Sequence, residues 1–97
     1  MVKVNDYDFS KHLKTEKDIQ LYLETAFEDG DPGFVAYALG NVAKVRGMSN
    51  VAKDSGLNRE NLYRALSKKS TPSYKVISGV MQSLGYGLAP VKLKKAG

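Results

Sequence analysis

The chain lacks cysteine altogether and has one histidine, and both scarcities limit its chemistry. Without cysteine it can form neither a disulfide framework nor a thiolate zinc site. The single histidine, His12, leaves no cluster for a metal, and no serine or carboxylate constellation can be assembled around it. The sequence also lacks a nucleophile elbow and a glycine-rich phosphate loop. We therefore expect no metal, no cofactor and no enzymatic activity.

Long apolar runs are absent as well. No stretch approaches the roughly 18 apolar residues of a membrane span, and the start of the chain lacks the apolar region of a signal peptide. We expect a cytoplasmic protein that does not bind membranes. With 97 residues and 42% hydrophobic content, the chain can bury one helical core but not two.

Charge is distributed unevenly along the chain. Residues 1–33 hold four lysines against eight carboxylates, whereas residues 34–97 hold eleven lysines or arginines against only Asp54 and Glu60. The basic part would attract a polyanion through counterion release. The acidic part is then expected to point away from such a ligand, and is a candidate surface for a basic protein partner. Favourable helix electrostatics is the alternative explanation for the acidic residues.

The stretch Met48–Leu66 has the residue types of a helix-turn-helix at the required offsets. The first helix needs a small residue where the second packs against it, and Ala52 fits that place. The turn needs a residue that accepts a positive φ, and Gly56 follows four residues later. The inward positions of the second helix are Leu57, Leu62 and Ala65. An ordinary αα-hairpin is the alternative, but the basic residues of the second helix and of the loop after it favour DNA binding.

In such a motif the N-terminal end of the second helix enters the major groove of duplex DNA. The residues expected to face base edges are Asn58, Arg59, Glu60 and Arg64. The residues expected to contact the phosphate backbone are Asn50, Lys53, Asn61, Tyr63, Lys68, Lys69 and Thr71. An RNA-binding module is a weaker alternative, because only Tyr63 and Tyr74 could offer stacking platforms near the basic residues.

Caps and apolar stripes predict five helices in residues 15–85. The first should run from an N-cap at Thr15 to Glu28. The second should run from Pro32, capped by Asp31, to Arg46, and end at Gly47. The third should be capped by Ser49. The fourth should be capped by Asn58 and end near Leu66, and the fifth should open at Pro72 with Thr71 as its cap and end at Gly85.

The two ends of the chain carry different patterns. Residues 1–14 are expected to form an extended N-terminal arm, and residues 86–97 a short β-strand with a basic tail. Pro90 would make this an edge strand. It could pair with the arm or with its copy in a homodimer, or remain a tail. A dimer is favoured, because useful operators normally need two copies of the motif. The residues expected to dimerise are Leu88, Val91 and Leu93.

The order of several short motifs resembles the addiction-module antidote proteins that carry a Cro-type helix-turn-helix. The motifs are Glu28-Asp-Gly-Asp-Pro32, Ala38-Leu-Gly-Asn-Val-Ala43, Arg46-Gly-Met48, Ala52, Ser55-Gly-Leu57, Asn61-Leu-Tyr-Arg-Ala-Leu66, Pro72-Ser73 and Leu84-Gly85. The resemblance implies an all-α, five-helix fold like that of Cro and lambda repressor. It also implies an antitoxin that neutralises a small, basic, ribonuclease-like toxin and represses its own operon. A stand-alone phage-type regulator is the alternative. Cro-type relatives often carry a phosphate-contacting Gln where this chain has Met48.

Overall fold

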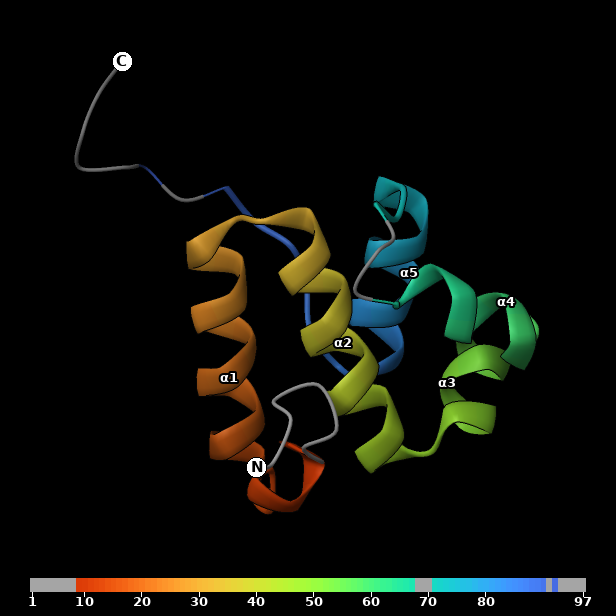
Figure 1. Ribbon diagram of the computed structural model, residues 1–97, viewed down its shortest axis with the longest axis horizontal. Helices are drawn as coiled ribbons and strands as arrows, with labels where there is room; N and C mark the ends of the chain where they lie inside the picture. Colours follow the sequence, from red (N-terminus) through yellow and green to blue (C-terminus); the bar gives the residue numbers. More distant parts are fainter. Residues whose placement is uncertain (1–8, 68–70, 91, 93–97) are drawn as a thin grey trace, which may run out of the picture.

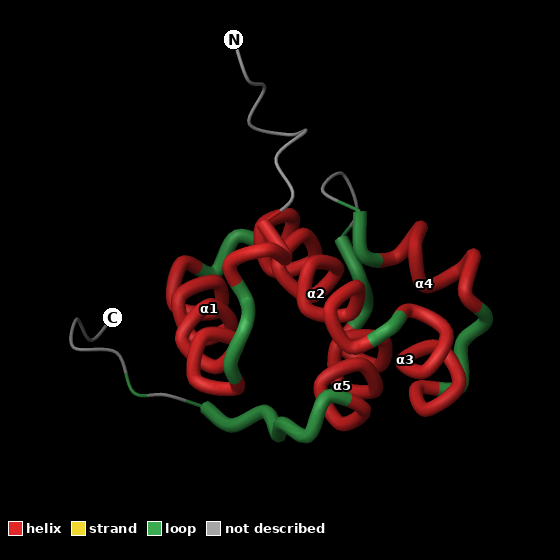
Figure 2. The backbone as a smooth tube through the Cα atoms, turned by 90° about the horizontal axis from the view of Figure 1, so that it is seen from below, coloured by secondary structure: helices red, strands yellow, loops and turns green. Residues whose placement is uncertain are grey.

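The computed structural model describes residues 9–67, 71–90 and 92. Within these ranges the chain forms a short 3₁₀ helix and five α-helices, with no β-strand (Figures 1 and 2). The elements are η2 (Phe9–His12), α1 (Glu16–Asp29), α2 (Pro32–Arg46), α3 (Met48–Ser55), α4 (Arg59–Ala65) and α5 (Tyr74–Ser83). The predicted all-α class and the five helices are confirmed. None of the helices in the described part of the chain is long and apolar enough to cross a membrane.

The starts of α1 and α2 follow the local chemistry of the sequence. The Thr15 hydroxyl accepts a hydrogen bond from the Asp18 N–H at 3.0 Å, and the Asp18 carboxylate accepts one from the Thr15 N–H at 3.1 Å. This reciprocal capping box satisfies two N–H groups that the first turn of α1 leaves open. Asp31 accepts a hydrogen bond from the Phe34 N–H at 2.9 Å, and Pro32 opens α2. The predicted caps of these two helices are confirmed.

The core is organised around α2, which packs against η2, α1, α3 and α5. It is buried on most sides, and α1 lies alongside it (Figure 1). The largest fully buried side chains come from three helices and are Leu39, Val42, Leu62 and Val80. At Gly40 the backbone of α2 passes so close to the end of α4 that an added Cβ would lie 3.0 Å from the Leu66 carbonyl oxygen.

Two predicted caps are wrong. The residue that precedes α3 is Gly47, at φ 99° and ψ 111°, and no side chain caps this helix. Ser49 therefore lies inside the first turn, because glycine lets the chain turn directly into the helix. Helix α5 begins at Tyr74, and its cap is Ser73, whose hydroxyl accepts from the Val76 N–H at 3.3 Å. Thr71 and Pro72 precede this cap.

The predicted extended arm and C-terminal strand are also not found in the described residues. Phe9–His12 forms the 3₁₀ helix, and Leu13 after it is buried. Residues 86–90 and 92 are irregular (Figure 2), because Leu88 packs against the chain's own core and no strand lies alongside to pair with this segment. The first eight residues, Val91 and Leu93 lie outside the described residues.

Candidate nucleic-acid interface

A three-residue turn, Gly56–Asn58, joins α3 to α4. Gly56 has a left-handed backbone (φ 78°), and the N–H of Leu57 donates to the Ala52 carbonyl at 2.9 Å. Asn58 then adopts an extended conformation, and its side-chain oxygen accepts from the Asn61 N–H at 2.7 Å. The turn thus ends one helix and caps the next with main-chain and side-chain hydrogen bonds. The roles predicted for Gly56 and Asn58 in shaping this turn are confirmed.

Buried side chains fix the two short helices against the core. Ala52 is 4% exposed where α3 packs between its neighbours, and Leu62 of α4 is fully buried. Leu57 is half-buried against the core, and Ala65 is half-buried as well. These positions are the ones the sequence pattern placed inward. Their burial leaves the opposite side of α4 open to solvent.

The open side of α4 carries mainly polar and charged side chains. Its exposed residues are Arg59, Glu60, Asn61, Tyr63 and Arg64. The Arg59 guanidinium lies over the Tyr63 ring, 5.5 Å from its centre, and its Nη2 donates a long hydrogen bond of 3.5 Å to the Tyr63 hydroxyl. This cation–π contact favours a guanidinium that lies along the helix surface. We call these five residues the α4 face.

The other predicted interface residues fall into three groups. Asn50 and Lys53 on α3 and Thr71 before α5 are exposed, as an interface would require. Asn58 is exposed too, but its side-chain oxygen is engaged in capping α4, which leaves its amide group for other contacts. Lys68 and Lys69 lie outside the described residues. The use of all these residues as nucleic-acid contacts stays a prediction.

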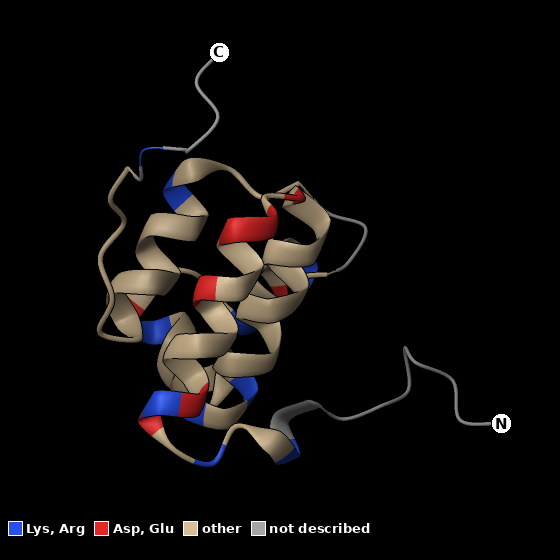
Figure 3. Ribbon diagram, turned by 90° about the vertical axis from the view of Figure 1, so that its left-hand side faces the viewer, with Lys and Arg blue, Asp and Glu red and all other residues tan. Residues whose placement is uncertain are grey.

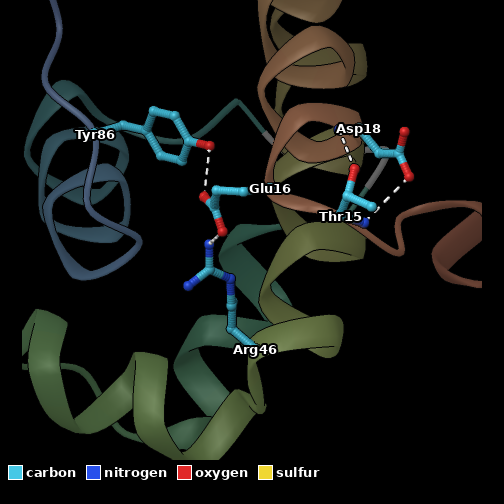
Figure 4. Close-up of polar contacts among 5 residues, drawn as sticks. All are labelled: Thr15, Glu16, Asp18, Arg46 and Tyr86. Atoms are coloured by element: carbon cyan, nitrogen blue, oxygen red, sulfur yellow. Dashed lines mark hydrogen bonds and ion pairs between the residues drawn. The ribbon is translucent and has the colours of Figure 1, made fainter.

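A polar cluster that the sequence does not predict joins α1, α2 and the segment after α5 (Figure 4). Glu16 at the start of α1 forms an ion pair with Arg46 at the end of α2, and its second oxygen accepts a hydrogen bond from the Tyr86 hydroxyl at 2.8 Å. Burial, and then this donation to Glu16, raise the pKa of Tyr86. No local sequence signal links these residues, because they come together only when the helices pack.

The remaining polar groups with shifted pKa values also have structural roles. Hydrogen bonds from the Thr15 and Lys14 N–H groups lower the pKa of Asp18. Burial raises the pKa of Tyr22, whose hydroxyl accepts from the buried Asn41 amide at 2.8 Å. No group of three or more potential ligand residues within the described ranges is placed to hold a metal ion.

Comparison with known proteins gives two matches. A family described as "Probable addiction module antidote protein" matches residues 3–92 of the chain. An uncharacterized protein of Haemophilus influenzae is 38% identical over 82 residues, which make up 84% of this chain and 84% of that protein. No solved structure matches the chain.

Proposed function

The chain belongs to the family of probable addiction module antidote proteins, and from this we propose that it is a DNA-binding antitoxin. In this proposal it binds a small basic toxin, represses its own operon through a helix-turn-helix formed by α3 and α4, and has no catalytic role. The family match supports the antidote role. The DNA-binding role is argued from the α3–α4 geometry.

One observation carries the DNA-binding part of the proposal. Helix α4 is held by a single fully buried side chain, Leu62, and exposes two arginines, a glutamate, an asparagine and a tyrosine. A helix of this kind supplies both requirements for groove binding: side chains that can hydrogen-bond to base edges, and positive charge near the phosphates.

The proposed role of each residue follows from its position in the helix-turn-helix motif. In the proposal, Arg59 and Arg64 bind base edges, with Glu60 and the amide of Asn58 beside them. The proposed backbone contacts are Asn50, Lys53, Asn61, Tyr63, Lys68, Lys69 and Thr71. Arg59 can reach a base edge if its guanidinium leaves the Tyr63 ring, which costs on the order of 1 kcal/mol for an exposed cation–π contact.

We also propose that the protein binds DNA as a two-fold dimer, since one such motif reads only a few base pairs. The packing seen in the described part of the chain limits which of the three expected residues could form the dimer interface. Leu88 already packs against its own core, so it is at most a partial contributor, and Val91 and Leu93 remain the other proposed contacts. Sedimentation of the protein with and without residues 86–97 tests this assignment. A shortened protein that stays folded and dimeric would contradict it.

The proposed function is tested by titrating the protein against fluorescently labelled nucleic acids. The probes are the duplex DNA immediately upstream of its own gene, a scrambled duplex of equal length and a single-stranded RNA. We expect the upstream duplex to bind tightest, and specific sites commonly exceed non-specific ones by at least about 10³-fold. Stronger binding to the RNA would favour an RNA-binding module, and equal binding to both duplexes would contradict operator recognition.

A further inference from the structure

The outer side of α1 carries an exposed leucine away from the core, with Lys17 one turn before it and two glutamates in the turns after it. Leu21, Glu24, Thr25 and Glu28 follow one another at helical spacing and are all exposed. We call these four residues the outer face of α1. Leu21 lies at one end of it and is 53% exposed. Figure 3, which looks towards α1, shows acidic positions along this helix.

Some acidic residues near α1 have an evident structural role. Asp18 closes the capping box, Asp31 caps α2, and Glu16 holds Arg46 and Tyr86. Carboxylates at a helix start are also favoured by the helix dipole. Favourable helix electrostatics therefore accounts for these three.

The same explanation fails for Glu28 of the outer face. Glu28 lies in the last turn of α1, which contains no basic residue, whereas its neighbour Asp29 accepts a hydrogen bond from the Asp31 N–H at 3.4 Å. Negative charge at this end of a helix is unfavourable, by about 0.3–1 kcal/mol per charge. Glu24 accepts a hydrogen bond only from Gln20, and neither Glu24 nor Glu28 forms an ion pair within the described ranges. Charges placed against local stability are characteristic of functional surfaces.

We propose that the outer face of α1 is the docking surface for a basic protein partner. Leu21 supplies an apolar anchor, and Glu24 and Glu28 pair with lysines or arginines of the partner. The inference rests on the proposed function, under which that partner is the toxin. The chemistry of the face predicts that the contact surface of the partner has basic residues around a small apolar patch.

The placement of this face has a consequence for regulation. Helices α1 and α4 lie at opposite sides of the molecule (Figure 1), with α2 between α1 and the α3–α4 pair. A partner on α1 therefore leaves the α4 face open. One chain can hold the toxin and the operator at the same time, so toxin binding does not by itself release the DNA.

The test uses the protein encoded by the reading frame next to this gene, purified separately, as the probe. Glu28→Lys and Leu21→Gln are the test variants. Asp54→Lys, which makes the same charge change on α3, and Val45→Gln, at an apolar residue 39% exposed on α2, are the matched controls. We expect each test variant to weaken binding about tenfold, as for moderate contact residues, and each control to stay within about twofold. Circular dichroism verifies that all four variants keep the helical content of the wild type.

The outcomes separate the surface from the function. If the wild type binds the probe and all four variants bind equally well, the outer face of α1 is the wrong surface while the antitoxin function stands. If the wild type does not bind, the proposed neutralisation fails and the docking surface fails with it. The operator duplex then tests whether the toxin and DNA can be bound at the same time. The probe should bind the preformed complex of the wild type with DNA. Displacement of the DNA by the probe would contradict simultaneous binding.

Discussion

The Tyr86 hydroxyl donates a hydrogen bond to Glu16 Oε2 over 2.8 Å and so joins two residues 70 positions apart (Figure 4). The other carboxylate oxygen of Glu16 pairs with Arg46. One side chain thereby links the start of α1, the end of α2 and the segment after α5. Leu88, two residues on, packs against the core and holds the same segment.

Removing the Tyr86 hydroxyl should weaken this link. We expect Tyr86→Phe to lower the free energy of unfolding by about 0.5–1.5 kcal/mol, the usual net value of a hydrogen bond, as measured by urea denaturation. Tyr74→Phe is the matched control, because Tyr74 is 72% exposed and its hydroxyl makes no hydrogen bond in the described residues. Equal stability of both variants and the wild type would show that the bond contributes nothing.

The capping box should make stability depend on acid pH. The folded state lowers the pKa of Asp18 below its usual 3.8 through the N–H groups of Thr15 and Lys14. The stabilisation by this carboxylate is therefore fully present above about pH 4 and is lost as the pH falls through the lowered value. A titration of the Asp18 carboxyl carbon by NMR measures that pKa directly. A midpoint at or above 3.8 would contradict the capping geometry.

Two glycines inside helices should respond oppositely to alanine. At Gly40 the added Cβ would lie 3.0 Å from the Leu66 carbonyl oxygen, whereas at Gly79 it would lie 3.5 Å from its nearest neighbour. Alanine gains up to about 1 kcal/mol of helix propensity at either site. Overpacking costs about 1–3 kcal/mol, so Gly40→Ala should be destabilising in thermal melts and Gly79→Ala neutral or stabilising. The same sign at both sites would contradict the close packing of α2 on Leu66.

The sequence predicted those features that depend on neighbouring residues. The caps at Thr15, Asp31 and Asn58 and the left-handed Gly56 all follow from local hydrogen bonding and backbone sterics. The start of α5 was misplaced because Thr71 and Ser73 are both good caps, and local chemistry does not choose between them.

Features that depend on distant residues could not be predicted. Alternation of apolar and basic residues favoured a strand after Pro90, but the preceding segment is held by Tyr86 and Leu88 instead. No periodicity marks Leu13 as a core residue, because it lies between two helices. The polar face of α4 was predicted from helical spacing, whereas the contact between Arg59 and Tyr63 needed the side-chain positions.

The phosphate contacts proposed for Lys68 and Lys69 can be counted from salt dependence. Replacing both lysines by alanine should reduce the slope of log affinity against log salt by about two, because each phosphate contact contributes about 0.9. Lys75→Ala, an exposed lysine on α5, serves as the control and should leave the slope unchanged. An unchanged slope in the double variant would show that these lysines do not contact the backbone.

In the proposed function α4 recognises operator DNA, and Arg59→Ala probes this recognition at a residue proposed to bind a base edge. The affinity of the variant is measured for the upstream duplex and for a scrambled duplex in the same salt, with Lys75→Ala as the control. We predict that Arg59→Ala loses about 1–3 kcal/mol of discrimination between the two duplexes, the value of a bidentate base contact, whereas the control loses none. An equal fall on both duplexes would reduce Arg59 to a phosphate contact, and unchanged affinity for both would contradict the DNA-binding role of the α4 face.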